Sequence, residues 1–126
     1  MNLLFVGGAR AVPLSTAMAE QALDQARVRG IRTHVVNHAD VLAVTPTVNA
    51  AAHAVSAVDF TRADETVAWA RGRARAGERF DAVFALQEMA QVTVAEVAAA
   101  IGAPGNPPDA VRRIRTKDLC RAALAA

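Results

Sequence analysis

The chain has 126 residues, of which 53% are hydrophobic, so it is long and apolar enough for one domain with a buried core. Its 14 basic and 12 acidic residues leave a formal charge of only +2, and 4% of the residues are aromatic. Nucleic-acid binding is therefore not expected, because it needs a concentrated basic surface or a platform of aromatic side chains.

The sequence also limits where in the cell the protein is expected and what its cysteine can do. No apolar run reaches membrane-spanning length and no charged leader precedes the first apolar segment, so we expect no membrane partner and a cytoplasmic location. The single cysteine, Cys120, excludes an internal disulfide and is expected to be a packed or half-exposed thiol. The densest arginine group lies on a predicted helix that also carries acidic residues, which favours a solvated face: Arg62, Arg71, Arg73, Arg75 and Arg79.

The chain begins with a predicted strand and a predicted helix. Residues 2–8, "NLLFVGG", form an apolar run ended by two glycines, which is typical of a buried parallel strand that stops at a tight turn. A helix is predicted over residues 13–30, with Pro13 near its start and Gly30 as its C-terminal stop. Its inner stripe is expected at helical spacing: Leu14, Met18, Ala22 and Ala26.

The middle of the chain predicts two more strands and a second long helix. Residues 31–38 read as a strand, residues 39–52 as irregular apart from a helical turn considered for "ADVLAV", and residues 53–58 as a weaker strand. A helix follows over residues 61–77. Its expected capping box is Thr61 with Asp64, and its expected inner stripe is Ala63, Val67, Ala70 and Ala74.

The last third predicts one strand followed only by helices. Residues 80–86, "FDAVFAL", form a fourth strand, and residues 88–102 form a helix that stops at Gly102. The inner face of this helix is expected to be Ala90, Val94, Val97 and Ile101. After the break "GAPGNPP", Asn106 is expected to cap a further helix that starts at Pro107.

This alternation predicts an α/β fold. Strands that alternate with helices indicate βαβ units, and right-handed crossovers place the helices on both faces of an open, Rossmann-like parallel sheet. We expect residues 1–104 to form this domain and residues 105–126 to form a helical linker.

Ligands of such sheets gather at the carboxyl ends of the strands. After the first strand, Gly7 and Gly8 would let the backbone approach a ligand and Arg10 could bind an anion, although a plain turn is the alternative. The spacing is not G-x-G-x-x-G, and no acidic residue follows about 20 residues on, so a dinucleotide site is excluded. After the fourth strand, Glu88 could receive a substrate amine, or it could simply favour the start of a helix.

No catalytic set and no metal site follow from the spacing of the remaining residues. His34 and His38 would lie on one face of a strand and His53 begins another, but no third ligand stands at metal spacing. We therefore expect structural histidines, and no Ser–His–Asp or Cys–His arrangement is indicated.

Residues 80–126 resemble the end of the N-terminal, pre-ATP-grasp domain of ATP-grasp ligases. The family pattern is a strand, a short polar turn that often bears Glu, a helix, and then a run that this chain matches at ten positions: Gly102, Pro104, Gly105, Asn106, Ala110, Val111, Arg115, Lys117, Arg121 and Leu124. The resemblance implies that Lys117 begins a helix and reaches the ATP phosphates, where lysine acts as a compact point charge. Thr116 stands where the family often has Asp or Asn, and threonine can still cap a helix.

Within that family, "GGARAVPL" differs from the turn of biotin carboxylases, and the branch that resembles L-amino-acid and dipeptide ligases fits better. The resemblance implies an ATP- and Mg²⁺-dependent ligase that joins a small carboxylate to an amine or a thiol through an acyl phosphate, with a homodimer considered as its assembly. It also implies that the chain is a piece of a longer enzyme, preceding an ATP-grasp domain that holds the metal ligands, and inactive by itself. The alternative is a stand-alone flavodoxin-like module that binds a small ligand or a protein without catalysis.

Overall fold

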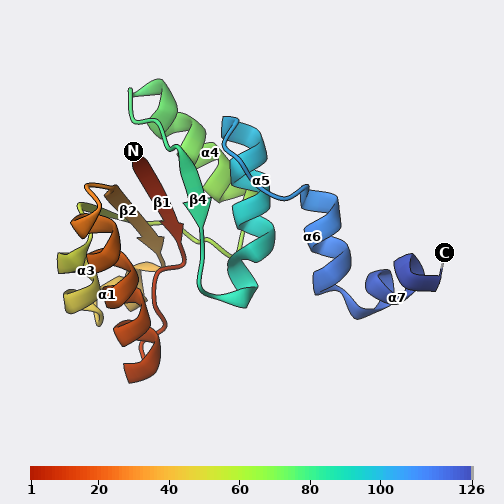
Figure 1. Ribbon diagram of the computed structural model, residues 1–126, viewed down its shortest axis with the longest axis horizontal. Helices are drawn as coiled ribbons and strands as arrows, with labels where there is room; N and C mark the ends of the chain where they lie inside the picture. The colour runs from red at the N-terminus through yellow and green to blue at the C-terminus, as the bar shows by residue number, and fades with distance from the viewer. Residues whose placement is uncertain (126) are drawn as a thin grey trace.

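A four-stranded parallel sheet forms the centre of the computed structural model, which describes residues 1–125 (Figure 1). The strand order is β3-β2-β1-β4, and all three neighbouring pairs run parallel. The strands are β1 (Asn2–Val6), β2 (Arg32–Asn37), β3 (Ala54–Ala57) and β4 (Ala82–Phe84). The chain builds outward from β1 to β3 and then crosses back to place β4 on the other side of β1, so the topological switch point lies between β1 and β4.

Helices connect successive strands, and further helices follow the last strand. They are α1 (Pro13–Val28), α2 (Ala39–Leu42), α3 (Pro46–Ala51), α4 (Ala63–Arg75), the 3₁₀ turn η1 (Glu88–Ala90), α5 (Gln91–Ile101), α6 (Pro108–Arg115) and α7 (Lys117–Ala125). The α/β fold with an open parallel sheet and C-terminal helices is confirmed.

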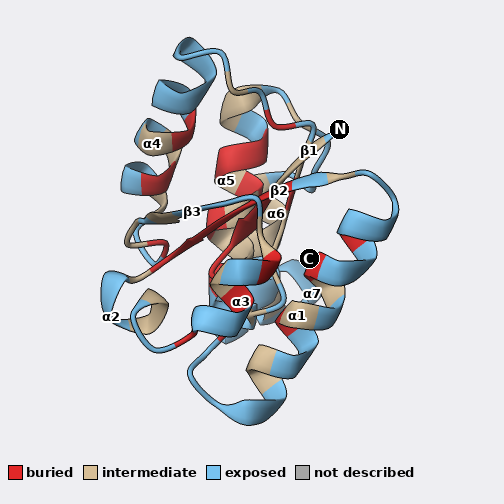
Figure 2. Ribbon diagram, turned by 90° about the vertical axis from the view of Figure 1, so that its left-hand side faces the viewer, coloured by how far each residue is buried: buried red, intermediate tan, exposed pale blue. Residues whose placement is uncertain are grey.

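The two faces of the sheet carry separate cores, as the buried residues in Figure 2 show. On one face, Phe5 and Val35 pack against Leu23 of α1 and Val48 of α3. On the other face, the strands pack against α4 and α5 in a core that contains Leu4, Val6, Val36, Val83, Ala70 and Val97. Because β1 is covered on both sides, its Leu4, Phe5 and Val6 are fully buried, which explains the unbroken apolar run in the sequence.

The inner stripe predicted for α1 was right for Ala26, which is buried, and wrong for Leu14 and Met18. Leu14 is 74% exposed and Met18 is also exposed, whereas Ala19 and Leu23 face the core with Ala26. Four alanines in this helix give it several nearly equivalent apolar stripes, so periodicity does not decide which side meets the sheet. The predicted stop is confirmed, because Gly30 has a φ of 71° and its N–H donates to the carbonyl of Arg27.

Of three further local predictions, one was right in part and two were wrong. Residues 39–52 were expected to be irregular apart from a helical turn considered for "ADVLAV", which is α2, but helix α3 was not predicted. The Thr61–Asp64 capping box does not form, because the hydroxyl of Thr61 donates to Asp59 and α4 begins after Arg62 without a side-chain cap. Asn106 caps no helix, since α6 begins at Pro108 after Pro107.

The inner faces of α4 and α5 were predicted in part. On α4, Ala70 is buried as expected. Ala74, which was also expected on the inner face, is exposed, and Thr66, which was not predicted there, is buried. On α5, Ala90 and Val97 are buried, and Val94 and Ile101 are half-buried against the same core. Gly102 ends α5 with a φ of 75°, as predicted.

Helices α6 and α7 lie beyond α5, outside the layers that cover the sheet (Figure 1). Arg112 of α6 forms an ion pair with Glu96 of α5, and Gly105 lies close to Ala98 of α5. Among the described residues of α6 and α7, none is buried. This segment is therefore attached to the domain mainly through α5.

Candidate functional site

A cavity of about 590 Å³ lies at the switch point, between the loops that follow β1 and β4. Its apolar lining is Val12, Leu14, Met18, Leu86 and Met89, and its polar lining is Arg10, Ser15, Gln87, Glu88 and Arg115. Open α/β sheets bind ligands at this place, because the loops on the two sides of the switch point diverge. The exposed side chains of Leu14 and Met18 do not pack in the core and instead form part of the cavity wall.

The two glycines after β1 shape the loop instead of lining the cavity. Gly7 and Gly8 have positive φ angles of 81° and 46°, which favour glycine. A Cβ on Gly8 would stand 2.9 Å from Cγ1 of Val35, and the side-chain amide of Asn37 donates to the carbonyl of Ala9 at 2.9 Å. The loop is therefore packed down on β2, and neither Gly7 nor Gly8 is among the residues that line the cavity.

Gln87 joins the two loops that border the cavity. Its side-chain amide donates to the carbonyl of Gly7 at 2.6 Å, while Gln91 donates to the carbonyls of Ala85 and Gln87 at 3.3 Å. No role was predicted for Gln87 from the sequence. The one sequence signal that could have indicated this contact is the position of a polar residue shortly after a buried strand.

Arg10 and Glu88, the two charged residues predicted at the carboxyl ends of the strands, line the same cavity. The backbone N–H of Arg10 donates to the hydroxyl of Ser15 at 2.8 Å, which fixes the turn that leads into α1. Within residues 1–125 the guanidinium of Arg10 takes part in no ion pair. An anion could therefore bind there without displacing a protein carboxylate.

Glu88 is the first residue of η1 and projects into solvent, with 87% of its side chain exposed. Its Oε1 lies 3.0 Å from Nη1 of Arg115, which reaches over from the end of α6. Arg115 was noted in the sequence only as one of the family matches. Its presence in the cavity depends on how α6 lies on α5, which no local pattern encodes.

Lys117 begins α7, as the resemblance implied, but it does not line the cavity. The helix starts with a hydrogen bond of 2.9 Å from the N–H of Cys120 to the carbonyl of Thr116. Lys117 is exposed, and no carboxylate in the described part of the chain pairs with it. Cys120 is half-exposed, within the range expected for it.

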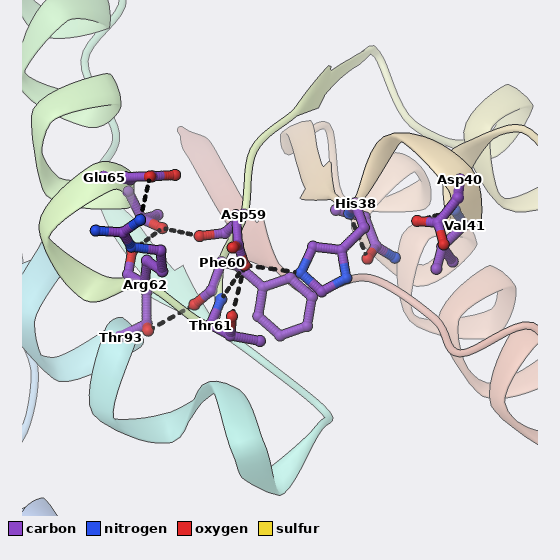
Figure 3. Close-up of polar contacts among 12 residues, drawn as sticks. His38, Asp40, Val41, Asp59, Phe60, Thr61, Arg62, Glu65 and Thr93 are labelled. Atoms are coloured by element: carbon purple, nitrogen blue, oxygen red, sulfur yellow. Dashed lines mark hydrogen bonds and ion pairs between the residues drawn. The ribbon is translucent and has the colours of Figure 1, made fainter.

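A second hollow, of about 500 Å³, lies beside β3 and is lined by a hydrogen-bonded pair, His38 and Asp59, that the sequence did not indicate. Nε2 of His38 lies 2.9 Å from Oδ1 of Asp59, and the imidazole stacks on Phe60 with ring centroids 4.7 Å apart (Figure 3). A hydrogen bond donated by the Thr61 hydroxyl, followed by one donated by His38, lowers the pKa of the Asp59 carboxyl. The pair orders the loop between β3 and α4.

His34 is buried in β2, an inner strand of the sheet. Nδ1 lies 2.7 Å from Glu78 and Nε2 lies 2.7 Å from the hydroxyl of Ser56, while Trp69 and Phe80 meet the imidazole ring edge-on. Burial raises the pKa of the Glu78 carboxyl, but hydrogen bonds from His34 and Arg73 outweigh it and the pKa is lowered. The imidazole is hydrogen-bonded at both nitrogens and enclosed, as expected for a structural histidine.

The described residues contain neither a cluster for a metal ion nor a helix for a membrane. Nowhere in residues 1–125 do three or more His, Cys, Asp or Glu side chains come together in a way that could hold a metal. In the same part of the chain, no helix combines the length and the apolar character needed to cross a bilayer.

The fold has a counterpart among solved structures. No protein-family model and no curated protein sequence matches the chain. The L-amino acid ligase from Bacillus licheniformis has a similar structure, with a TM-score of 0.70 and 21% sequence identity over 98% of this chain. The match covers 29% of the ligase chain, so this chain spans less than a third of that protein's length. At this identity the likeness establishes the fold alone, as that of a stretch of the ligase chain.

Proposed function

We propose that the chain is the N-terminal, substrate-side domain of an ATP-dependent ligase that joins a small carboxylate to an amine, or to a thiol, through an acyl phosphate. The observation that carries the proposal is the switch-point cavity. It brings Arg10 and Glu88 to one apolar hollow within a fold that matches a piece of an L-amino acid ligase over almost the whole chain.

The cavity offers complementary chemistry to an amine substrate that also bears an apolar group. The carboxylate of Glu88 can accept charge-assisted hydrogen bonds from an ammonium group, and the guanidinium of Arg10 can bind a carboxylate in two-point fashion. The wall of Val12, Met18 and Met89 would cover an apolar side chain. Small-molecule substrates are accordingly the proposed partners, and a cytoplasmic location remains part of the proposal.

Among the described residues there is a candidate contact for ATP but no set of ligands for Mg²⁺. Lys117, exposed at the start of α7, could contact one phosphate of ATP. Mg²⁺ prefers several oxygen ligands, and the described residues bring no such set together. ATP and Mg²⁺ are therefore proposed for the longer enzyme, with Lys117 as this chain's single contribution.

Lys117 can be tested in a longer protein that contains this domain. Lys117→Ala should weaken ATP binding or slow phosphoryl transfer about tenfold or more, because a hydrogen bond to a charged group is worth about 1.5–3 kcal/mol. Lys117→Arg keeps the charge but not the compact shape, so it serves as the control. Unchanged ATP kinetics in the alanine variant would make Lys117 an ordinary surface residue.

The amine assignment can be tested on the 126-residue chain by NMR titration. The probe is L-leucinamide, a primary ammonium with an apolar side chain, and N-acetyl-L-leucinamide is its neutral counterpart. The charged probe alone should shift the backbone amides of Gln87 and Met89, and Glu88→Gln should abolish the shift. Glu65→Gln removes an exposed carboxylate from α4 and controls for net charge. Equal shifts with both probes would contradict the role of Glu88.

The second candidate is a binding module without catalysis, which one observation favours. Arg10, Glu88 and an apolar wall come together in one cavity of about 590 Å³, which offers a small ligand both charged contacts and apolar cover. The two functions differ in their need for ATP, and a longer protein of this kind that binds the amine but never turns over ATP would favour the module.

A further inference from the structure

Arg115 already occupies the place where the proposed function puts a substrate amine. Its side chain is 31% exposed, lines the cavity, and holds Oε1 of Glu88 at 3.0 Å. A guanidinium and an ammonium are both cations that donate hydrogen bonds to a carboxylate. The unliganded chain therefore supplies its own cation to Glu88.

The attachment of α6 leaves this end of the helix free to move. Arg112, one turn before Arg115, pairs with Glu96 of α5 and with Asp109 of α6 itself. Beyond Arg112, no residue of the segment 113–119 is buried, so no core contact holds this segment. The contact with Glu88 is the one ion pair that Arg115 makes within residues 1–125.

The contact is also weak enough for a ligand to break. Glu88 is largely exposed, and exposed ion pairs contribute about 0–1 kcal/mol because water screens the charges. A ligand that bound Glu88 while burying an apolar group against Met18 and Met89 would gain more than the pair contributes.

We propose that Arg115 is an internal competitor for the ammonium subsite on Glu88, and that a bound primary ammonium displaces it and releases the end of α6. The proposal rests on the assignment of Glu88 to an amine in the proposed function. Because Arg115 precedes Lys117 by two residues, displacement would change the position of the start of α7 when the cavity is filled. Arg115 thus sets the affinity for the amine and couples the cavity to the C-terminal helices.

The competition can be measured on the full 126-residue chain. L-leucinamide is titrated by NMR into the parent, Arg115→Gln, Arg113→Gln and Glu88→Gln, and hydrogen exchange of the α6 and α7 amides is followed with and without the probe. Arg113 is exposed on the same helix and makes no ion pair within residues 1–125, so its variant matches the charge change. All three positions are exposed, so the variants are expected to fold.

The expected result is that Arg115→Gln tightens binding of the probe by about two- to fivefold, the range that an exposed ion pair allows, and that Arg113→Gln leaves it unchanged. The probe should also speed exchange at the end of α6 in the parent and not in Arg115→Gln.

Two other results would overturn the proposal, and they differ in whether the proposed function also fails. Unchanged or weaker binding in Arg115→Gln, with binding lost in Glu88→Gln, would mean that Arg115 assists or ignores the amine, and the proposed function would stand. Binding that survives in Glu88→Gln, or no binding to the parent, would remove Glu88 as the amine site and defeat both proposals.

Discussion

The side-chain amide of Gln87 donates a hydrogen bond of 2.6 Å to the carbonyl oxygen of Gly7, across 80 residues of sequence. Gly7 follows β1 and Gln87 follows β4, so this single contact joins the two loops of the switch point. Arg10 and Glu88 lie one to three residues beyond these anchors, and their common cavity depends on the spacing that the contact fixes.

Gln87→Ala should lower the free energy of unfolding by about 0.5–1.5 kcal/mol, the usual contribution of one hydrogen bond. Urea denaturation followed by circular dichroism would measure the change. Gln21→Ala, on an exposed position of α1, should stay within about 0.5 kcal/mol of the parent. Equal effects of the two variants would show that the loop contact adds nothing.

The corrected face of α1 predicts opposite results for two identical substitutions. Leu23→Ala should cost about 2–5 kcal/mol, because Leu23 is 1% exposed and its loss leaves a cavity in the core. Leu14→Ala should change stability by less than about 0.5 kcal/mol, since Leu14 lies in the open wall of the switch-point cavity. Thermal and urea melts of both variants test this, and a large loss in Leu14→Ala would restore the stripe predicted from the sequence.

Gly8→Ala should destabilise the chain more than Gly30→Ala. Both glycines have positive φ, and an alanine there is strained by about 1–3 kcal/mol. At Gly8 the new methyl group would also stand 2.9 Å from Val35, whereas at Gly30 nothing lies within 4 Å. The difference between the two melting temperatures isolates the steric contribution, and equal losses would show that the β1 loop can move aside.

Acid should remove stability that depends on Glu78. Its pKa is lowered in the folded chain from the ordinary value of 4.5, so the unfolded chain binds a proton more readily. The contribution is therefore fully present above about pH 4.5 and is lost as the pH falls through the lower folded pKa. Urea midpoints measured across this range should fall less steeply in Glu78→Gln than in the parent.

Glu65→Gln, which removes one exposed carboxylate from α4, controls for the change in net charge in that experiment. An acid limb with the same slope in the parent and in Glu78→Gln would show that the contacts of Glu78 with His34 and Arg73 add no pH-dependent stability.

The 126-residue chain should neither bind Mg-ATP measurably nor hydrolyse it. Lys117 offers one exposed charge, worth about 0–1 kcal/mol, while even millimolar affinity requires about 4 kcal/mol. Isothermal calorimetry with Mg-ATP should therefore give no binding isotherm. Micromolar binding would instead identify a nucleotide site complete within this chain.

Local physical chemistry is what the sequence determined by itself. The apolar run of β1, the alternation of strands and helices, and the stops at Gly30 and Gly102 each depend on neighbouring residues, and all were predicted. The same holds for Arg10 and Glu88, because parallel strands end at one edge of the sheet and their loops must meet there.

Only the tertiary structure decided which side of each helix is buried and which distant residues touch. An alanine-rich helix such as α1 presents several apolar stripes of nearly equal hydrophobicity, so the sheet selects Leu23 over Leu14 by shape and not by periodicity. The contacts of Gln87 with Gly7 and of Arg115 with Glu88 join segments whose relative position is set by packing of whole elements. Long-range hydrogen bonds and ion pairs leave no periodic trace in a single sequence, because either partner is an ordinary surface residue until the fold brings them together.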